Sequence, residues 1–215
     1  NFKSEQSVEV DATLSFANSY FTFELTGYNN NISNYIYLGQ TSDTIRGYPV
    51  FRYFQSDANL KGLEAGIIVN PYGWLGFSAS YSTVIAKRSD DTYLPMIPAD
   101  KITSSVHFEM ANWKSIYNPY VELSAYTAFI KTHLSYNESS VPGYTLLNVG
   151  FGCDLRFEKQ LFSIAISCNN MLDNVYIDFM SRIKLLNATY NGVTFYANNM
   201  GRNIVLAVKI PFKLS

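Results

Sequence analysis

Apolar and polar residues alternate along most of the chain with a period of two, which is the pattern of β-strands rather than helices. The clearest stretch spans residues 201–212. One of its faces is apolar throughout and ends in an aromatic residue: Ile204, Leu206, Val208, Ile210 and Phe212. In a soluble sheet such a face would lie on a core, and in a membrane barrel it would lie on lipid. Alternation alone leaves both possibilities open.

The same alternation predicts about nine strands and no amphipathic helix. Tight turns are expected at 17–19, 70–73, 113–115 and 158–159, and longer polar connections at 39–47, 87–98, 133–142 and 170–200. The strand at 49–69 is expected to bend through a bulge near Ser56 and Asp57, where the alternation slips. Short and long connections therefore alternate along the chain. Bacterial outer-membrane barrels have short periplasmic turns and long extracellular loops, so this order favours a membrane barrel over a soluble sandwich.

Charge is confined to one of the two strand faces. The apolar face carries almost none, whereas the other face carries Glu9, Asp11, Glu24, Glu64, Lys101, Glu109, Glu122, Asp154 and Lys209. A charge on lipid costs ~2–4 kcal/mol at the middle of a bilayer, so this division fits a barrel whose charged face lines a wet or plugged lumen. Composition agrees, because 47% of the residues are hydrophobic and only 15% are charged, against roughly 25% in soluble domains.

The strand count and the net charge narrow the interpretation further. A chain that starts at the extracellular end and finishes in the periplasm needs an odd number of strands, whereas single-chain bacterial barrels have an even number. Residues 1–215 are therefore expected to be the C-terminal portion of a larger antiparallel transmembrane β-barrel. Taken alone, they should form an open, curved sheet with two unpaired edges. A net charge of -1 argues against a nucleic-acid surface.

The two cysteines flank the tight turn at 158–159. Hairpin pairing about that turn sets Cys153 opposite Ile164 and Cys168 opposite Val149. The offset is too long for a disulfide, so both are expected to be small apolar residues of the outward face.

Several stretches, in order, resemble TonB-dependent outer-membrane receptors. The C-terminal part carries the most specific ones, a loop entry at 167–176, then Ser181-Arg182-Ile183-Lys184, and then Gly201-Arg202-Asn203 with the terminal Phe212. Asn170-Met171-Leu172-Asp173 stands where the family usually has an Asn-Leu-Phe-Asp-like sequence. Other similar stretches are Gly62-Leu63-Glu64, Leu94-Pro95-Met96-Ile97-Pro98 and Pro142-Gly143-Tyr144.

The resemblance implies that this chain forms the last nine strands of a 22-stranded barrel, with an upstream plug domain and a TonB-contacting segment. It implies uptake of a scarce ligand across the bacterial outer membrane, such as an iron–siderophore, another metal chelate, haem or a vitamin. The implied partners are the TonB energy-coupling complex, the barrel-assembly machinery, membrane lipid and the small ligand. The assembly signal falls on Ile210 and Phe212, although Lys213-Leu214-Ser215 follow the aromatic.

Within this resemblance, the Ser-Arg-x-Lys sequence is most similar to receptors for metals or metal chelates. Members of that subset often carry a His before the Ser-Arg. The nearby residue is Phe179 in this chain, which argues against a metal role.

No catalytic residue, metal ligand set or cofactor is expected. Ser105 and His107 share one strand face about 7 Å apart, too far for a nucleophile and its base. His133 with Asn137 and Glu138 falls short of a metal site.

Ligand contact is instead assigned to two groups of residues. The lumen-facing candidates are Arg52, Glu64, Lys101, His107 and Glu109, and the outer-loop candidates are Tyr35, Tyr37 and His133. For Tyr35 and Tyr37 an aromatic girdle at the membrane interface is the favoured alternative to ligand contact.

Three alternatives remain open at this point. A passive porin would have a similar wall, an outer-membrane enzyme would need a Ser–His pair at the outer rim, and a soluble β-sandwich would bury the apolar face.

Overall fold

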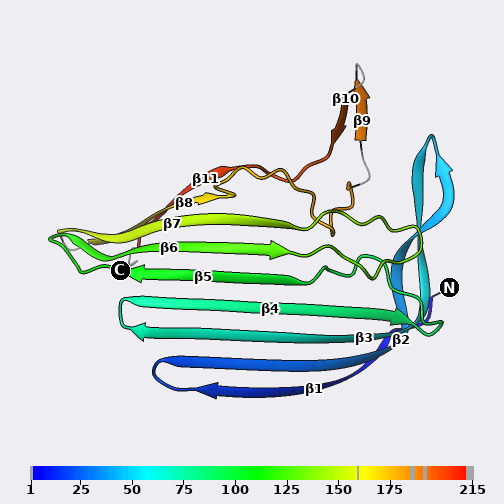
Figure 1. Cartoon of the computed structure of the whole chain (residues 1–215), viewed down its shortest axis with the longest axis horizontal. Coiled ribbons are helices and arrows are strands. Elements are labelled where there is room, and N and C mark those ends of the chain that lie inside the picture. The colour runs from blue at the N-terminus through cyan, green and yellow to red at the C-terminus, as the bar shows by residue number, and fades with distance from the viewer. Residues whose placement is uncertain (1, 159, 185–186, 191–192, 212–215) are drawn as a thin grey trace.

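The chain forms one long antiparallel sheet, described here for residues 2–158, 160–184, 187–190 and 193–211 of a computed structural model. Nine strands pair in the order β1-β2-β3-β4-β5-β6-β7-β8-β11. Their bounds are β1 Gln6–Ala17, β2 Phe21–Ile45, β3 Tyr48–Tyr72, β4 Leu75–Arg88, β5 Lys101–Glu109, β6 Ile116–Ala128, β7 Tyr144–Phe157, β8 Gln160–Asn169 and β11 Asn203–Lys209. A separate hairpin, β9 (Asn187–Tyr190) with β10 (Val193–Tyr196), stands off the sheet (Figure 1).

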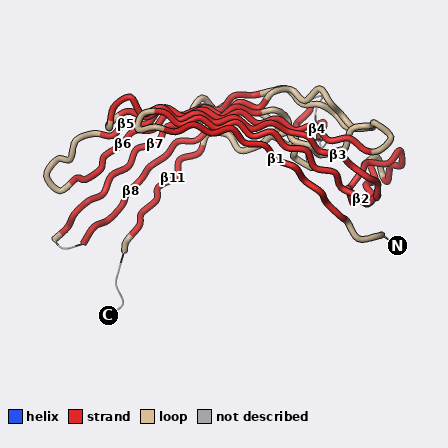
Figure 2. Tube along the Cα trace, turned by 90° about the horizontal axis from the view of Figure 1, so that it is seen from below, coloured by secondary structure: helices blue, strands red, loops and turns tan. Residues whose placement is uncertain are grey.

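The sheet is open and curved, as predicted. β1 and β11 each pair on one side only, and Figure 2 shows the arch that the nine strands make between them. No second sheet packs across its face in the described part of the chain, which excludes a sandwich there. Within these described residues, no helix is long and apolar enough to cross a membrane.

Tight turns gather at one end of the sheet and loops at the other. In Figure 1 the turns lie at the left, whereas loops 89–100, 129–143 and 170–202 start from the right-hand strand ends. One predicted connection is wrong, because 39–47 is not a polar loop. β2 and β3 stay paired up to Ile45 and Tyr48, and the chain turns on Arg46 (φ 54°) and Gly47 (φ 83°). Two successive positive φ values are typical of a two-residue hairpin turn. The strands therefore stay paired up to this turn, although the polar composition of 39–47 is that of a loop.

The predicted bulge lies where expected but on the other strand. Ile32 pairs with Ala58 and Tyr35 pairs with Ser56, so β2 carries the extra residue opposite Asp57. Asn34 adopts φ 60° there, and its backbone N–H donates to Asp57 Oδ1 at 2.9 Å. The bulge is thus stabilised by the aspartate that the sequence had marked as the irregular position.

Cross-strand register keeps the two faces distinct over the whole sheet. An apolar row runs Phe77–Val106–Leu123–Val149–Cys168–Ile204 through successive strand pairs. The adjacent row on the opposite face is polar, and the Ser78 and Ser105 hydroxyls bond there at 2.8 Å. The apolar row meets open space rather than a partner layer, since Phe77 is 40% exposed, Leu123 46% and Ile204 69%.

Both cysteine positions match the prediction. Cys153 pairs with Ile164 and Cys168 with Val149, and both thiols are free.

Among the described residues, the cluster of buried apolar side chains lies at the loop end of the sheet. Its members are Ala58, Ala86, Leu94 and Ile97. Ala58 lies on the same face of β3 as Glu64, because alternate residues share a face. Loop 89–100 therefore folds over the polar face of β3 and β4, and its Leu94 is 1% exposed.

Gly143, just before β7, tests how tightly this end is packed. A Cβ there would lie 2.8 Å from the Ala128 carbonyl oxygen and 3.0 Å from the Ile130 nitrogen. Gly143→Ala should therefore lower the free energy of unfolding by about 1–3 kcal/mol, because backbone atoms must move. Urea unfolding of the protein measures this change. Gly150→Ala, within β7 itself and with nothing within 4 Å of the added Cβ, is the matched control and should differ little from wild type.

Candidate ligand site among the loops

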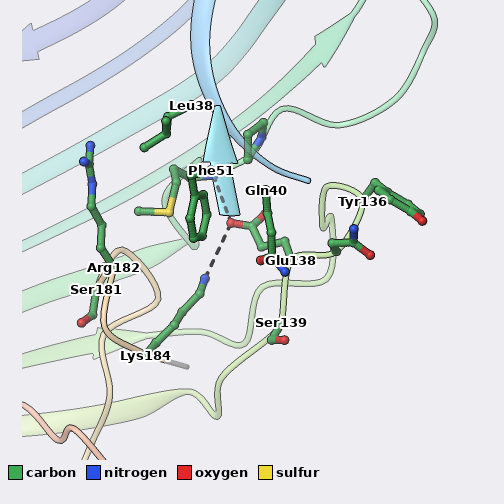
Figure 3. Close-up of a pocket in the computed structure, with 12 residues that line it drawn as sticks. Leu38, Gln40, Phe51, Tyr136, Glu138, Ser139, Ser181, Arg182 and Lys184 are labelled. Atoms are coloured by element: carbon green, nitrogen blue, oxygen red, sulfur yellow. Dashed lines mark hydrogen bonds and ion pairs between the residues drawn. The ribbon is translucent and has the colours of Figure 1, made fainter. Parts of the chain in front are cut away.

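Three loops are joined by one buried ion pair. Glu138 Oε1 lies 3.6 Å from Lys184 Nζ, and the two side chains are 7% and 6% exposed (Figure 3). The Glu138 carboxylate also accepts the backbone N–H of Met96 at 3.0 Å and that of Ser135 at 3.3 Å. Each partner belongs to a different loop, so this carboxylate connects 89–100, 129–143 and 170–202.

Lys184 is itself tightly enclosed. Its Nζ donates to the Phe179 carbonyl at 2.9 Å and lies 3.6 Å from the centre of the Phe179 ring. Burial lowers the pKa of the Lys184 ammonium, and the neighbouring Glu138 opposes that shift. Phe179 is only 5% exposed, so its side chain is a packing residue of this loop.

A second buried lysine fixes the loops to the sheet. Lys131, 6% exposed, donates through Nζ to the Pro98 carbonyl at 2.9 Å and to the Val84 carbonyl at 3.2 Å. Burial lowers its pKa, against the opposing effect of Asp100 and Glu138. Lys131 thus holds loop 89–100 and the start of loop 129–143 against β4.

The two C-terminal motifs of the sequence come together in the third loop. Asp173 Oδ1 accepts the backbone N–H of Arg202 at 2.8 Å, and a Cβ on Gly201 would lie 2.7 Å from the same oxygen. Asn170, 3% exposed, exchanges two hydrogen bonds of 2.9 Å with the backbone of Asn174. These contacts explain Asn170, Asp173 and Gly201 at these positions, whereas Arg202 contributes only its backbone N–H.

A cavity of about 290 Å³ opens between the loops and the β2–β3 hairpin. Its lining residues are Leu38, Gln40, Phe51, Pro95, Met96, Tyr136, Asn137, Glu138, Ser139, Ser181, Arg182 and Lys184. The wall is mainly apolar, and the Glu138–Lys184 pair forms one side of it (Figure 3). Such a cavity, apolar with a few polar groups, is typical of small-molecule sites, although it lies at the small end of their range.

None of the eight predicted contact residues lines this cavity. Arg52 stands on the β2–β3 hairpin beyond the bulge, where its guanidinium pairs with exposed Asp43 at 3.1 Å. Glu64 and Lys101 share the polar face lower down, each opposite Ser82 of β4. Their role as ligand contacts stays a prediction.

His107 and Glu109 form a separate cluster on the polar face. His107 Nε2 lies 3.6 Å from Glu109 Oε1, and His107 Nδ1 lies 3.6 Å from Glu122 Oε2. Its ring stacks on Tyr120 at 5.2 Å between centroids. Ser105 hydrogen-bonds across to Ser78 instead of to this histidine.

The outer tyrosines are packed into the protein rather than arranged as a free platform. Tyr35 and Tyr37 pack against the buried core, and the Tyr37 hydroxyl accepts from Arg88 at 2.7 Å. His133 lies against the Tyr93 ring at 4.9 Å, whereas Glu138 is taken up by Lys184. No group of three or more His, Cys, Asp or Glu in the described residues is arranged to hold a metal ion.

Reasoning from sequence therefore missed the cavity itself. Met96, Arg182 and Lys184 stood in stretches that resembled the receptor family, and Glu138 was considered only beside His133. No local pattern indicates that Glu138 and Lys184 meet. Of the proposed assembly signal, Ile210 follows β11 and is exposed, and Phe212 lies outside the described residues.

Removal of one partner from the buried pair should loosen all three loops. Glu138→Gln and Lys184→Met should each lower the free energy of unfolding by about 3–5 kcal/mol, because each leaves the other partner buried without its counter-charge. The double variant should cost less than the sum of the two single variants. Hydrogen exchange at the Met96 and Ser135 amides, which both donate to Glu138, reports the loosening directly.

The exposed pair Lys87–Asp91 supplies the control. Lys87→Met should change stability by less than about 1 kcal/mol. Unchanged Met96 and Ser135 exchange in Glu138→Gln would contradict the role given to the carboxylate.

Solved structures share this fold over nearly the whole chain. The copper transporter OprC superposes with a TM-score of 0.80 at 16% identity, covering 99% of this chain and 32% of its own. The ferric yersiniabactin uptake receptor FyuA from Yersinia pestis gives 0.68 at 13% identity, covering 99% and 31%. The ferric preacinetobactin receptor BauA from Acinetobacter baumannii gives 0.65 at 15% identity, covering 95% and 29%.

The chain thus spans about a third of the length of these structures, and at such identities the likeness establishes the fold alone. No curated protein sequence matches it. The sequence profile of the family described as "TonB dependent receptor-like, beta-barrel" matches residues 1–171, which is most of the chain. With the nine-stranded open sheet, this match shows that the chain belongs to the TonB-dependent receptor β-barrel family.

Proposed function

We propose that this chain is the C-terminal part of the barrel of an outer-membrane receptor that imports a scarce small ligand with energy from TonB. The observation that carries the proposal is the loop-end cavity, enclosed by three cross-linked loops in a barrel of this family. A ligand arriving from outside would meet these loops first. The class of cargo is an iron–siderophore, another metal chelate, haem or a vitamin. The fold neighbours are named as a copper transporter, a ferric yersiniabactin uptake receptor and a ferric preacinetobactin receptor.

The partners follow from the same proposal. Upstream strands would pair with the free edge of β1 and close the barrel against β11, around a plug domain that fills the lumen. TonB would act on a segment before that plug, and the barrel-assembly machinery would insert the whole in the bacterial outer membrane. The charged face, with Glu64, Lys101 and Glu122, would then surround the plug.

Ser105 and His107, the Ser–His pair weighed for catalysis, have other partners: Ser105 hydrogen-bonds to Ser78, and His107 lies against Glu109 and Glu122. Passive diffusion is the alternative that an experiment must separate from TonB-dependent import.

Cells that carry the full-length receptor should accumulate one labelled cargo from a panel of copper and ferric-siderophore complexes only when TonB is present. The same cells without TonB, and cells without the receptor, are the controls. Equal uptake with and without TonB, together with ion conductance of the purified protein in planar bilayers, would establish a passive pore instead.

A single substitution tests which face meets lipid. Leu123→Arg places a charge in the apolar row and should destabilise the full-length receptor in vesicles by about 2–4 kcal/mol. Ser124→Arg, the next residue, puts the same charge on the polar face beside Ser105 and Asn148 and should cost less. Denaturant unfolding compares the two, and an equal cost would mean that the apolar face does not meet lipid.

A further inference from the structure

The cavity among the loops carries one cation that the loop framework does not use. Of the three charged residues that line it, Glu138 and Lys184 are paired with each other and with backbone groups. Arg182, two residues before Lys184, is exposed and has no hydrogen bond or ion pair to another described residue. In Figure 3 its guanidinium points away from the Glu138–Lys184 pair, along the side of the cavity where Leu38 lies.

The nearby carboxylates are already engaged. Glu138 accepts two backbone N–H groups besides its ion pair. Asp178, in the same loop as Arg182, accepts the Tyr144 hydroxyl at 2.6 Å and the Met180 N–H at 2.8 Å, and it does not line the cavity. The lining therefore offers one uncompensated positive charge, on a planar group with several donors.

The rest of the wall suits an apolar body. Leu38, Phe51, Pro95 and Met96 contribute carbon and sulfur surface to the same cavity as Arg182. Phe51, a large apolar side chain of the cavity lining, is 43% exposed. A flexible Met beside it adapts to ligands of irregular shape.

We propose that this cavity binds an amphipathic organic anion, with its carboxylate-type oxygens on Arg182 and its apolar or aromatic body against Phe51 and Met96. Arginine presents a fork that matches a carboxylate in two parallel hydrogen bonds, so it fixes the orientation of the anion as well as its charge. The proposal rests on the import function above and gives the class of cargo, or of the chelating part of a cargo, that the loops select.

The same geometry disfavours two other ligand classes. A cation would meet Arg182 and Lys184 while Glu138 is already occupied. A small inorganic anion would satisfy Arg182 but leave the apolar wall in contact with water, so it would gain no affinity from burial.

Binding of 2-naphthoate and its neutral analogue 2-naphthamide to the purified full-length receptor, followed by calorimetry, tests the proposal. Naphthoate should bind more tightly than naphthamide, and inorganic phosphate should displace it only weakly. Arg182→Gln should weaken naphthoate binding by about tenfold to a hundredfold and leave naphthamide binding unchanged. Arg182→Lys, which keeps the charge but loses the fork, should fall between wild type and Arg182→Gln.

Arg202→Gln is the matched control, since Arg202 is an exposed arginine of the same loop that does not line the cavity. It should leave naphthoate binding unchanged. Phe51→Ser should weaken naphthoate and naphthamide alike, because it removes apolar wall and no charge.

Two results would overturn the assignment: naphthamide binding as tightly as naphthoate, or Arg182→Gln binding naphthoate like wild type. The outcome is independent of the transport test. Cargo uptake that needs TonB, with no charge preference in the cavity, would refute this ligand class and keep the import function. An Arg182-dependent anion site without TonB-dependent uptake would do the opposite.

Discussion

Register is the constraint on which the rest of the structure depends. In this sheet, antiparallel pairing sets apolar residues of neighbouring strands opposite one another on one face. A slip of one residue would move every side chain of a strand to the other face of the sheet. From β4 to β11 two neighbouring rows are apolar throughout, one from Phe77 to Ile204 and one from Leu75 to Leu206. The next row has a polar member at Ser104, between Ala79 and Ala125. Along the two apolar rows one face therefore remains apolar from β4 to β11, and the other is free to carry charge.

The position of the bulge shows how the register is kept where it matters. On β2 the outward face turns polar at Asn29 and Asn31, whose side-chain oxygens both accept from Asn59. The extra residue enters only beyond them, at Ser33 and Asn34. The bulge thus lies beyond the last apolar position of β2 in these rows, so it disrupts none of them. The strand segments that follow it form the hairpin that rises above the sheet and contributes Leu38 and Phe51 to the cavity.

The sequence predicted what local rules determine. Alternation placed the strands, and the tight turn at Glu158 alone was enough to pair Cys153 with Ile164. The prediction of a loop at 39–47 was wrong, because it was based on polar composition. Pairing of this segment with β3 makes it a strand instead. Prediction from sequence also failed at the cavity, where Glu138 and Lys184 come from loops far apart in the chain and no periodic pattern links them.

The loop end differs physically from the sheet that supports it. The sheet has almost no buried core, whereas the loops bury Leu94, Phe179 and two lysines. Burial of a charged lysine is unfavourable in itself, which is why the pKa values of Lys131 and Lys184 are lowered. A lysine whose pKa is lower in the folded than in the unfolded state reduces stability below that folded pKa, and the loss is relieved as the pH rises toward 10.5.

At neutral pH the hydrogen bonds of these lysines, and the ion pair of Lys184, stabilise the loops, whereas the desolvation of their buried charges destabilises them. The net hold on the loops is smaller than the number of contacts suggests. Segments that open to admit a ligand come from the less stable parts of a structure. Cross-linking by buried charges gives these loops a defined shape around the cavity, and the desolvation of the same charges limits how firmly that shape is kept.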